Sequence, residues 1–170
     1  SRILSEIKKC SESLRIPIIA KEVGSGISVR SAKKLQLGGI IWIEVAGRGG
    51  ASWARIEMSR NSNDYLKKVA EPFLDWGMST VSLIKLIRRN MSAVNLIGSG
   101  GIRNGLDVAK CLILGCDLAA VAQPFLSPAR KSSEAVIEAV SVYTEQLKWA
   151  LFLTGSRNLI DLKKVKIYEK

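Results

Sequence analysis

The chain has 170 residues, of which 47% are hydrophobic and 24% are charged, and this composition excludes a disordered chain. Its 26 Lys and Arg residues against 15 Asp and Glu give a net charge of +11, which favours anionic partners. The chain contains no histidine, which excludes Ser-His-Asp and Cys-His catalysis, and no apolar run is long enough to cross a membrane.

The first half of the sequence alternates between helical and strand patterns. Residues 2–14 have apolar side chains at helical spacing, and the short apolar run 18–21 predicts a buried strand. Ser28 is an N-cap signal for a helix that continues to Leu37, and residues 40–45 predict the next strand.

The second half repeats this order after a polar segment from Gly47 to about Asp75, which we expect to be a long loop. The expected elements are a helix over 79–89, a strand over 94–97, a helix from Asn104 or Gly105 to Leu114, a strand over 118–122 and a helix over 132–153. The basic tail over 159–170 carries no clear pattern.

Four strand–helix units in alternation predict parallel strands joined by right-handed crossovers. Such a series is half of an eight-stranded barrel, so we expect an α/β fold in which residues 1–170 form one domain, half of a (βα)8 TIM barrel. The outer strands of a half-barrel would have unpaired edges, which another polypeptide, further chain or a second copy must cover. A small flavodoxin-like open sheet is the alternative fold.

The three cysteines are Cys10, Cys111 and Cys116, and they lie in apolar segments without a CxxC pair. We therefore expect reduced core thiols, a cytoplasmic protein and no metal site. The basic residues are dispersed over predicted helix surfaces, so nucleic acid is not an expected partner. The chain begins with Ser1 and no signal-peptide pattern follows, so we expect a cut or processed start.

The most informative motif is the glycine-rich segment from Gly98 to Gly105, which follows a strand and opens a helix. Glycines let the backbone approach an anion, so amides, the positive helix end and Arg103 can hold a phosphate. Residues 121–125 follow the next strand, and two consecutive strand ends of this kind form the phosphate site of many barrels. The alternative is that the glycines only form tight turns.

Lys21 stands at the carboxyl end of the first predicted strand. It would point into the site if the barrel closes, where a cation can stabilise negative charge on a reduced cofactor ring. The alternative is a lysine that reaches from the strand end to solvent.

Several segments of the chain together resemble the type II, FMN-dependent isopentenyl-diphosphate isomerase family. The segments are PIIAKEVGSGIS (17–28), AGRGGASWARIE (46–57), FLDWGMST (73–80), GSGGIRNGLDVAK (98–110) and AQPFL (122–126). The resemblance implies the C-terminal half of the barrel and the conversion of isopentenyl diphosphate to dimethylallyl diphosphate in isoprenoid biosynthesis. It also implies reduced FMN, Mg²⁺ and NADPH as cofactors.

By position, the resemblance implies that Lys21 contacts the pyrimidine side of the flavin. The residues that would hold the FMN phosphate are Gly101, Ile102, Arg103, Ala122 and Gln123. Ala46 and Ala51 depart from the family pattern, which has a polar side chain and a threonine there, both in contact with FMN. Each lost hydrogen bond to a charged group costs about 1.5–3 kcal/mol, so we expect weakened FMN binding.

The family's substrate-binding, catalytic and Mg²⁺-binding side chains lie in its N-terminal half, so we expect no catalytic residue and no metal ligand in this chain. The first hypothesis is therefore an isomerase half that is completed by an N-terminal half, in the same or a separate chain. The second is a degenerate, non-catalytic half-barrel that serves as a basic structural subunit of a larger assembly. The third is self-association of two copies, and we expect a homo-oligomer.

Overall fold

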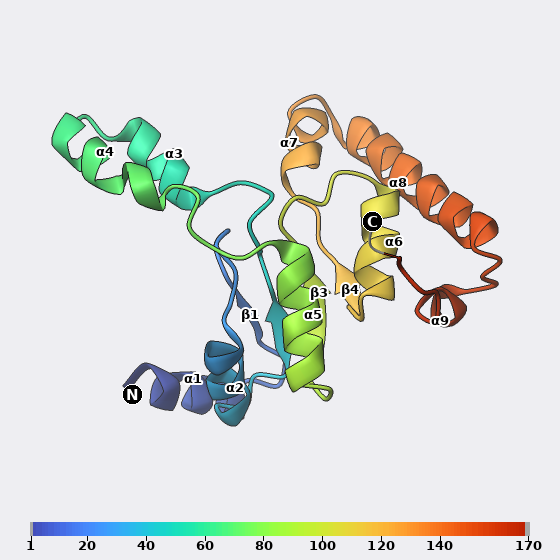
Figure 1. Ribbon diagram of the computed structural model, residues 1–170, viewed down its shortest axis with the longest axis horizontal. Helices are drawn as coiled ribbons and strands as arrows, with labels where there is room; N and C mark the ends of the chain where they lie inside the picture. Colours follow the sequence, from blue (N-terminus) through green and yellow to red (C-terminus); the bar gives the residue numbers. More distant parts are fainter. Residues whose placement is uncertain (1, 169–170) are drawn as a thin grey trace.

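The computed structural model describes residues 2–168 and contains a four-stranded parallel sheet in the order β1-β2-β3-β4 (Figure 1). The strands are β1 (Ile19–Lys21), β2 (Trp42–Glu44), β3 (Asn95–Gly98) and β4 (Leu118–Ala119). Each strand pairs with its successor in the chain, and every pair is parallel. This is the strand order of consecutive βα units in a TIM barrel, and it confirms the predicted α/β fold.

Helices connect the strands. They are α1 (Arg2–Ser13), α2 (Val29–Leu37), α3 (Trp53–Arg60), α4 (Asp64–Ala70), the 3₁₀ helix η1 (Glu71–Phe73), α5 (Thr80–Asn90), α6 (Gly105–Ile113), α7 (Gln123–Ala129), α8 (Ser133–Leu153) and α9 (Leu159–Leu162). The predicted N-cap Ser28 accepts a hydrogen bond from the Ser31 amide, and Asn104 accepts one from the Asp107 amide. These bonds satisfy amides that the first helical turn leaves without partners.

The prediction of one long loop from Gly47 to Asp75 is wrong. Helices α3 and α4 and the turn η1 occupy this segment, which extends away from the sheet (Figure 1). Ser52 caps α3 through the Arg55 amide, and Asn63 caps α4 through the amides of Tyr65 and Leu66. Both helices are short and neither has a buried residue, so the sequence carries no clear helical spacing of apolar residues in this segment.

Two further differences lie near the end of the sheet. Strand β4 ends at Ala119, earlier than the predicted strand over 118–122, and α7 begins at Gln123. Helix α7 contains Pro124 in its first turn, where proline is tolerated, and Pro128 further along, where proline normally argues against a helix. The basic tail contains the short helix α9.

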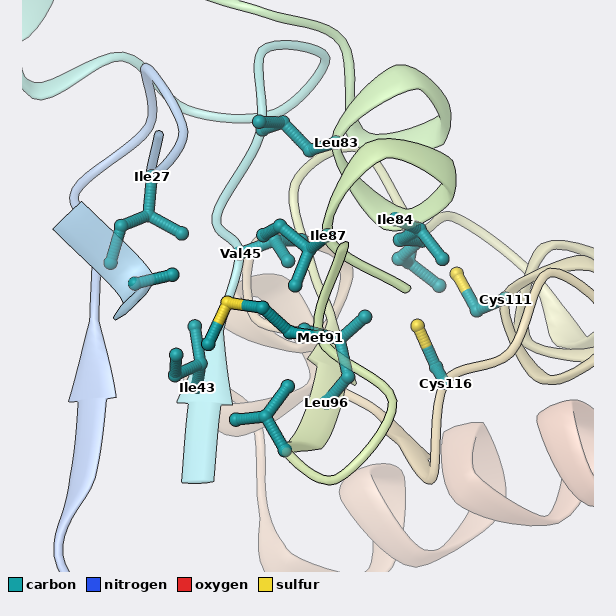
Figure 2. Packing of buried hydrophobic residues seen from close by; sticks show 13 residues of the cluster. Ile27, Ile43, Val45, Leu83, Ile84, Ile87, Met91, Leu96, Cys111 and Cys116 are labelled. Carbon is teal, nitrogen blue, oxygen red and sulfur yellow. The ribbon is translucent and has the colours of Figure 1, made fainter. Parts of the chain in front are cut away.

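One face of the sheet packs against α2, α5 and α6 and forms the main core (Figure 2). Ile43 and Leu96, from neighbouring strands, are fully buried against Leu83, Ile84 and Ile87 of α5. Burial of side chains of this size is the main term that stabilises a domain, at about 1.5–3 kcal/mol each. A second, smaller cluster joins α6, α8 and α9.

The cysteines are free thiols, but only two of them lie in the core as expected. Cys10 is exposed on α1, which corrects the prediction for that residue. Cys111 and Cys116 are buried beside Gly98, where the hydrogen bond between them lowers the pKa of Cys111 and raises that of Cys116. Among residues 2–168, no helix has the length and apolar character needed to cross a membrane.

Candidate functional site

Lys21 and Glu44 lie on the sheet face that points away from the helices. Ala20 pairs in register with Ile43, whose side chain belongs to the core, and successive strand residues point to opposite faces. Lys21 and Glu44 form the next pair, and their side chains therefore share the other face, which is the interior face of a barrel. The structure thus places Lys21 as the sequence predicted, at the carboxyl end of β1.

The Lys21 ammonium donates to the Glu44 carboxylate over 2.5 Å. The Lys21 side chain is 56% exposed, whereas that of Glu44 is only 13% exposed. Sequence reasoning missed Glu44 because it stands within an apolar run, although the buried neighbours Ile43 and Val45 show the alternation that would single it out.

Glu22, the residue after β1, organises the loop that follows it. Its Oε2 atom accepts hydrogen bonds from the amides of Gly24, Ser25 and Gly26, at 2.7, 2.7 and 2.8 Å. Three backbone donors on one carboxylate oxygen hold the chain in a tight turn beside Lys21. The sequence contained this residue within a matched segment, but its role depends on a loop conformation that spacing alone does not reveal.

The two glycine-rich loops, 47–50 and 98–101, pack directly against each other. Gly100 and Gly101 have φ angles of +99° and +80°, which favour glycine. A Cβ atom on Gly100 would overlap the Gly47 carbonyl oxygen, and one on Gly101 would lie 2.6 Å from that of Gly49. The close contact between the loops therefore already requires glycine at these positions, whether or not a ligand also approaches them.

Hydrogen bonds between the two loop segments, together with the Thr80 side chain of α5, hold this pair of loops in place. The Ala46 amide donates to Ser99 Oγ at 3.0 Å, and the Gly47 amide donates to the Ser99 carbonyl at 3.0 Å. The buried Thr80 hydroxyl also contacts the carbonyl oxygens of Ser99 and Gly100. The loop that follows β3 is thus fixed before any ligand arrives, which lowers the entropic cost of binding.

The predicted phosphate ligands belong to two neighbouring strand ends. Gly98 pairs with Ala119, so the chain beyond β3 and the chain beyond β4 leave the sheet side by side. Within residues 2–168, the amides of Gly101, Ile102 and Gln123 donate no hydrogen bond, and no side chain caps α7. Free amides at this edge are suitable donors for a phosphate group.

Arg103 contributes the positive charge at this edge. Its side chain is exposed, and one guanidinium nitrogen contacts the Gly49 carbonyl at the long distance of 3.4 Å. Its own amide donates to Asp107 at 3.2 Å, so that amide is not available to a ligand. The guanidinium is held loosely by the protein, and most of its donors remain for an anion. Together with the free amides, the donor set fits a phosphate.

The two alanines that depart from the expected pattern offer no side-chain hydrogen bond. Ala46 is 4% exposed and has a φ angle of 39°, which is uncommon for a residue other than glycine. Ala51 is exposed between the glycine-rich loop and α3. At both positions the protein provides only backbone groups and a methyl group to a ligand.

The family model described as FMN-dependent dehydrogenase matches residues 3–169. The chain belongs to this FMN-dependent family. The resemblance to isopentenyl-diphosphate isomerases is also confirmed: the isopentenyl-diphosphate delta-isomerase of a Nostoc species is 43% identical over 161 residues. That of Methanocaldococcus jannaschii is 42% identical over 162 residues.

These two matches each cover 95% of this chain but 46% and 44% of the relatives. The chain therefore spans about half the length of the curated isomerases that it matches.

Solved structures of a lactate oxidase and a mandelate oxidase share the fold. A putative lactate oxidase from Pediococcus acidilactici superposes with a TM-score of 0.71 at 22% identity, over 96% of this chain and 39% of the oxidase. A mandelate oxidase superposes with a TM-score of 0.72 at 18% identity, over 96% of this chain and 41% of the oxidase. At these identities the likeness concerns the fold alone. It confirms the predicted fold of this chain, in which consecutive strand–helix units are arranged as in a TIM barrel.

Proposed function

We propose that the chain is the FMN-binding half of an isopentenyl-diphosphate isomerase, which converts isopentenyl diphosphate to dimethylallyl diphosphate in isoprenoid biosynthesis. The observation that carries this proposal is the similarity to isomerases at 43% identity, over 95% of the chain. Lys21, Arg103 and the free amides also lie at the carboxyl edge of one sheet, where ligands of such folds bind.

In this proposal, the FMN phosphate is held by two neighbouring strand ends. The residues that hold it are Gly101, Ile102, Arg103, Ala122 and Gln123. Lys21 lies on the interior face and contacts the pyrimidine side of the flavin, while Glu44 holds the ammonium in place. When bound, reduced FMN supplies a ring that carries negative charge, and the Lys21 ammonium stabilises that charge.

The N-terminal half of the barrel is the proposed partner, in the same or a separate chain. It would supply the catalytic side chain, the Mg²⁺ ligand and the remaining substrate contacts, and NADPH would serve as reductant. The uncovered outer strands support the need for a partner, since Ile19 on β1 is 50% exposed and Leu118 on β4 is 51% exposed. We propose a cytoplasmic location on the support of the three free thiols.

A second candidate is a non-catalytic half-barrel that serves as a basic structural subunit of a larger assembly. Ala46 and Ala51 favour it, because neither side chain can donate a hydrogen bond to a flavin. The net charge of +11 also suits an acidic partner. Self-association of two copies would cover the same exposed edges.

Gel filtration with an absorbance spectrum separates these candidates. We would mix the purified chain with an N-terminal half from a related isomerase, add FMN and collect the complex. The first proposal expects co-elution of the halves with a flavin spectrum. A chain that does not co-elute with the N-terminal half, and that carries no flavin in its presence, would support the second candidate instead.

A further inference from the structure

A cleft of about 430 Å³ opens beside the 47–50 loop. Its walls come from this loop, from the start of α3, from the segment that leads into α5 and from Gly24 in the loop that follows β1. The polar side chains in the walls include two arginines, Arg48 and Arg55, and one carboxylate, Asp75. Trp76, whose side chain is largely exposed, forms an apolar part of the wall.

Asp75 leaves both guanidinium groups only partly satisfied. Arg55 forms an ion pair with its carboxylate at 2.6 Å, while Arg48 donates to its backbone carbonyl at 3.1 Å. Each guanidinium has five N–H donors, so most donors of both side chains remain for a ligand. Two positive charges face one negative charge, and the cleft therefore carries net positive charge.

The backbone of the 47–50 loop lies between this cleft and the predicted phosphate ligands. Gly49 and Gly50 line the cleft, yet a Cβ atom on Gly50 would lie only 2.7 Å from the Gly101 amide nitrogen. The Gly49 carbonyl also contacts the Arg103 guanidinium. The cleft is thus adjacent to the proposed FMN phosphate site, but Arg103 and the amides that form that site do not line it.

We propose that this cleft is a second anion site, which binds a phosphate or diphosphate group between Arg48 and Arg55. Guanidinium groups form paired hydrogen bonds with the oxygens of such ions, and two of them around one cleft favour an ion with several oxygens. Trp76 provides a surface for the organic part of the ligand. The choice of ligand rests on the proposed function: the anion is the diphosphate of the substrate or the phosphate of a cofactor.

Inorganic pyrophosphate is the probe for the site. We would titrate it into the 170-residue chain and follow binding by isothermal calorimetry, with far-UV circular dichroism to check folding. Arg48→Ala and Arg55→Ala should each weaken binding about tenfold or more, since each removes a charged donor. Arg60→Ala is the matched control, because Arg60 lies on the same helix outside the cleft and pairs with Glu57.

Asp75→Asn provides a test in which the expected result is tighter binding, which a loss of folding would not produce. It removes the competing carboxylate from Arg55 and keeps the backbone carbonyl that Arg48 contacts. We expect pyrophosphate binding to become about three- to tenfold tighter, because the cleft gains net positive charge. The proposal is overturned if the wild-type chain does not bind pyrophosphate, if both arginine variants bind as wild type, or if Asp75→Asn weakens binding.

Two further titrations identify the source of the anion. If Arg48→Ala weakens isopentenyl diphosphate but not FMN, the cleft is a substrate site; the reverse result assigns it to the cofactor. If neither ligand depends on Arg48, the assignment to the proposed reaction is overturned. Pyrophosphate binding is measured without FMN or an N-terminal half, so its failure is distinguishable from failure of the isomerase proposal.

Discussion

The Lys21 ammonium lies 2.5 Å from the Glu44 carboxylate, across the carboxyl ends of β1 and β2. Glu44 is the less exposed partner, and its position fixes the ammonium on the interior face of the sheet. A cation held at one point by a neighbouring strand is suited to stabilise charge that develops on a ligand nearby.

Lys21→Met should weaken FMN binding in the reconstituted barrel by about ten- to hundredfold, because it removes a charged donor. The loss should be greater for reduced FMN, which carries more negative charge, so the midpoint potential of the bound flavin should fall. Potentiometric titration measures this shift, with Lys67→Met on α4 as a control, because Lys67 pairs locally with Asp64. An unchanged potential in Lys21→Met would show that the ammonium does not contact the flavin.

Arg103→Ala tests the phosphate site separately from the flavin ring. We expect FMN affinity to fall about tenfold or more, since a guanidinium–phosphate contact is lost. Riboflavin, which has the same ring without a phosphate, should bind equally well to the variant and the wild type. Quenching of flavin fluorescence measures both affinities, and an equal loss for the two flavins would argue against a phosphate contact.

The Glu22 carboxylate should stabilise the fold through its three bonds to backbone amides. Glu22→Ala leaves these partly buried donors without an acceptor, so we expect a loss of about 1–3 kcal/mol in the free energy of unfolding. Urea unfolding monitored by circular dichroism measures the change. Glu57→Ala on α3 is a suitable comparison, because its carboxylate has only a weak contact with Arg60, at 4.0 Å, and an unchanged midpoint is expected there.

Gly100→Ala should be strongly destabilising, because the left-handed backbone and the Gly47 carbonyl both oppose a side chain. Gly155→Ala shares the positive φ angle but has no atom within 4 Å of the added methyl, so it should cost only about 1–2 kcal/mol. Thermal unfolding compares the two variants. Equal melting temperatures would contradict the direct packing of the two glycine-rich loops.

Asp117 should make stability depend on pH. Burial raises its pKa, but the Leu96 amide together with Arg88 and Lys163 outweighs this effect, so its pKa is lowered in the fold. A lowered pKa means that the carboxylate stabilises the fold above its ordinary pKa of about 4, and that this contribution is lost as the pH falls through the folded value.

Asp117→Asn removes this pH-dependent contribution. Urea midpoints at pH 6 and pH 3 should therefore differ less in Asp117→Asn than in the wild type. An equal difference in both proteins would show that Asp117 does not contribute.

The elements with strong local signals could be predicted from the sequence. Ser28, Ser79 and Asn104 each cap a helix whose start was expected, and the apolar runs that follow turns became parallel strands. Helices α3 and α4 were missed although Ser52 and Asn63 cap them, because short helices with little burial lack a clear apolar period. Helix α7 was missed because Pro128 lies beyond the first turn, where proline normally argues against a helix.

The location of a site residue could be predicted from the sequence when it depends only on the residue's position along one strand. Lys21 at a strand end is such a residue, and the structure places it on the interior face. Its partner Glu44 was not predictable from one strand, because the contact depends on the register between β1 and β2. The cleft with Arg48 and Arg55 depends on the path of the segment before α5, which no local pattern specifies.

Isomerisation by the reconstituted halves tests the central claim most directly. The measurement is the conversion of isopentenyl diphosphate to dimethylallyl diphosphate with FMN, NADPH and Mg²⁺, for each half alone and for their mixture. We predict conversion by the mixture, none by either half, and none when FMN is omitted. A mixture that forms a stable complex yet shows neither flavin absorbance nor conversion would contradict the account.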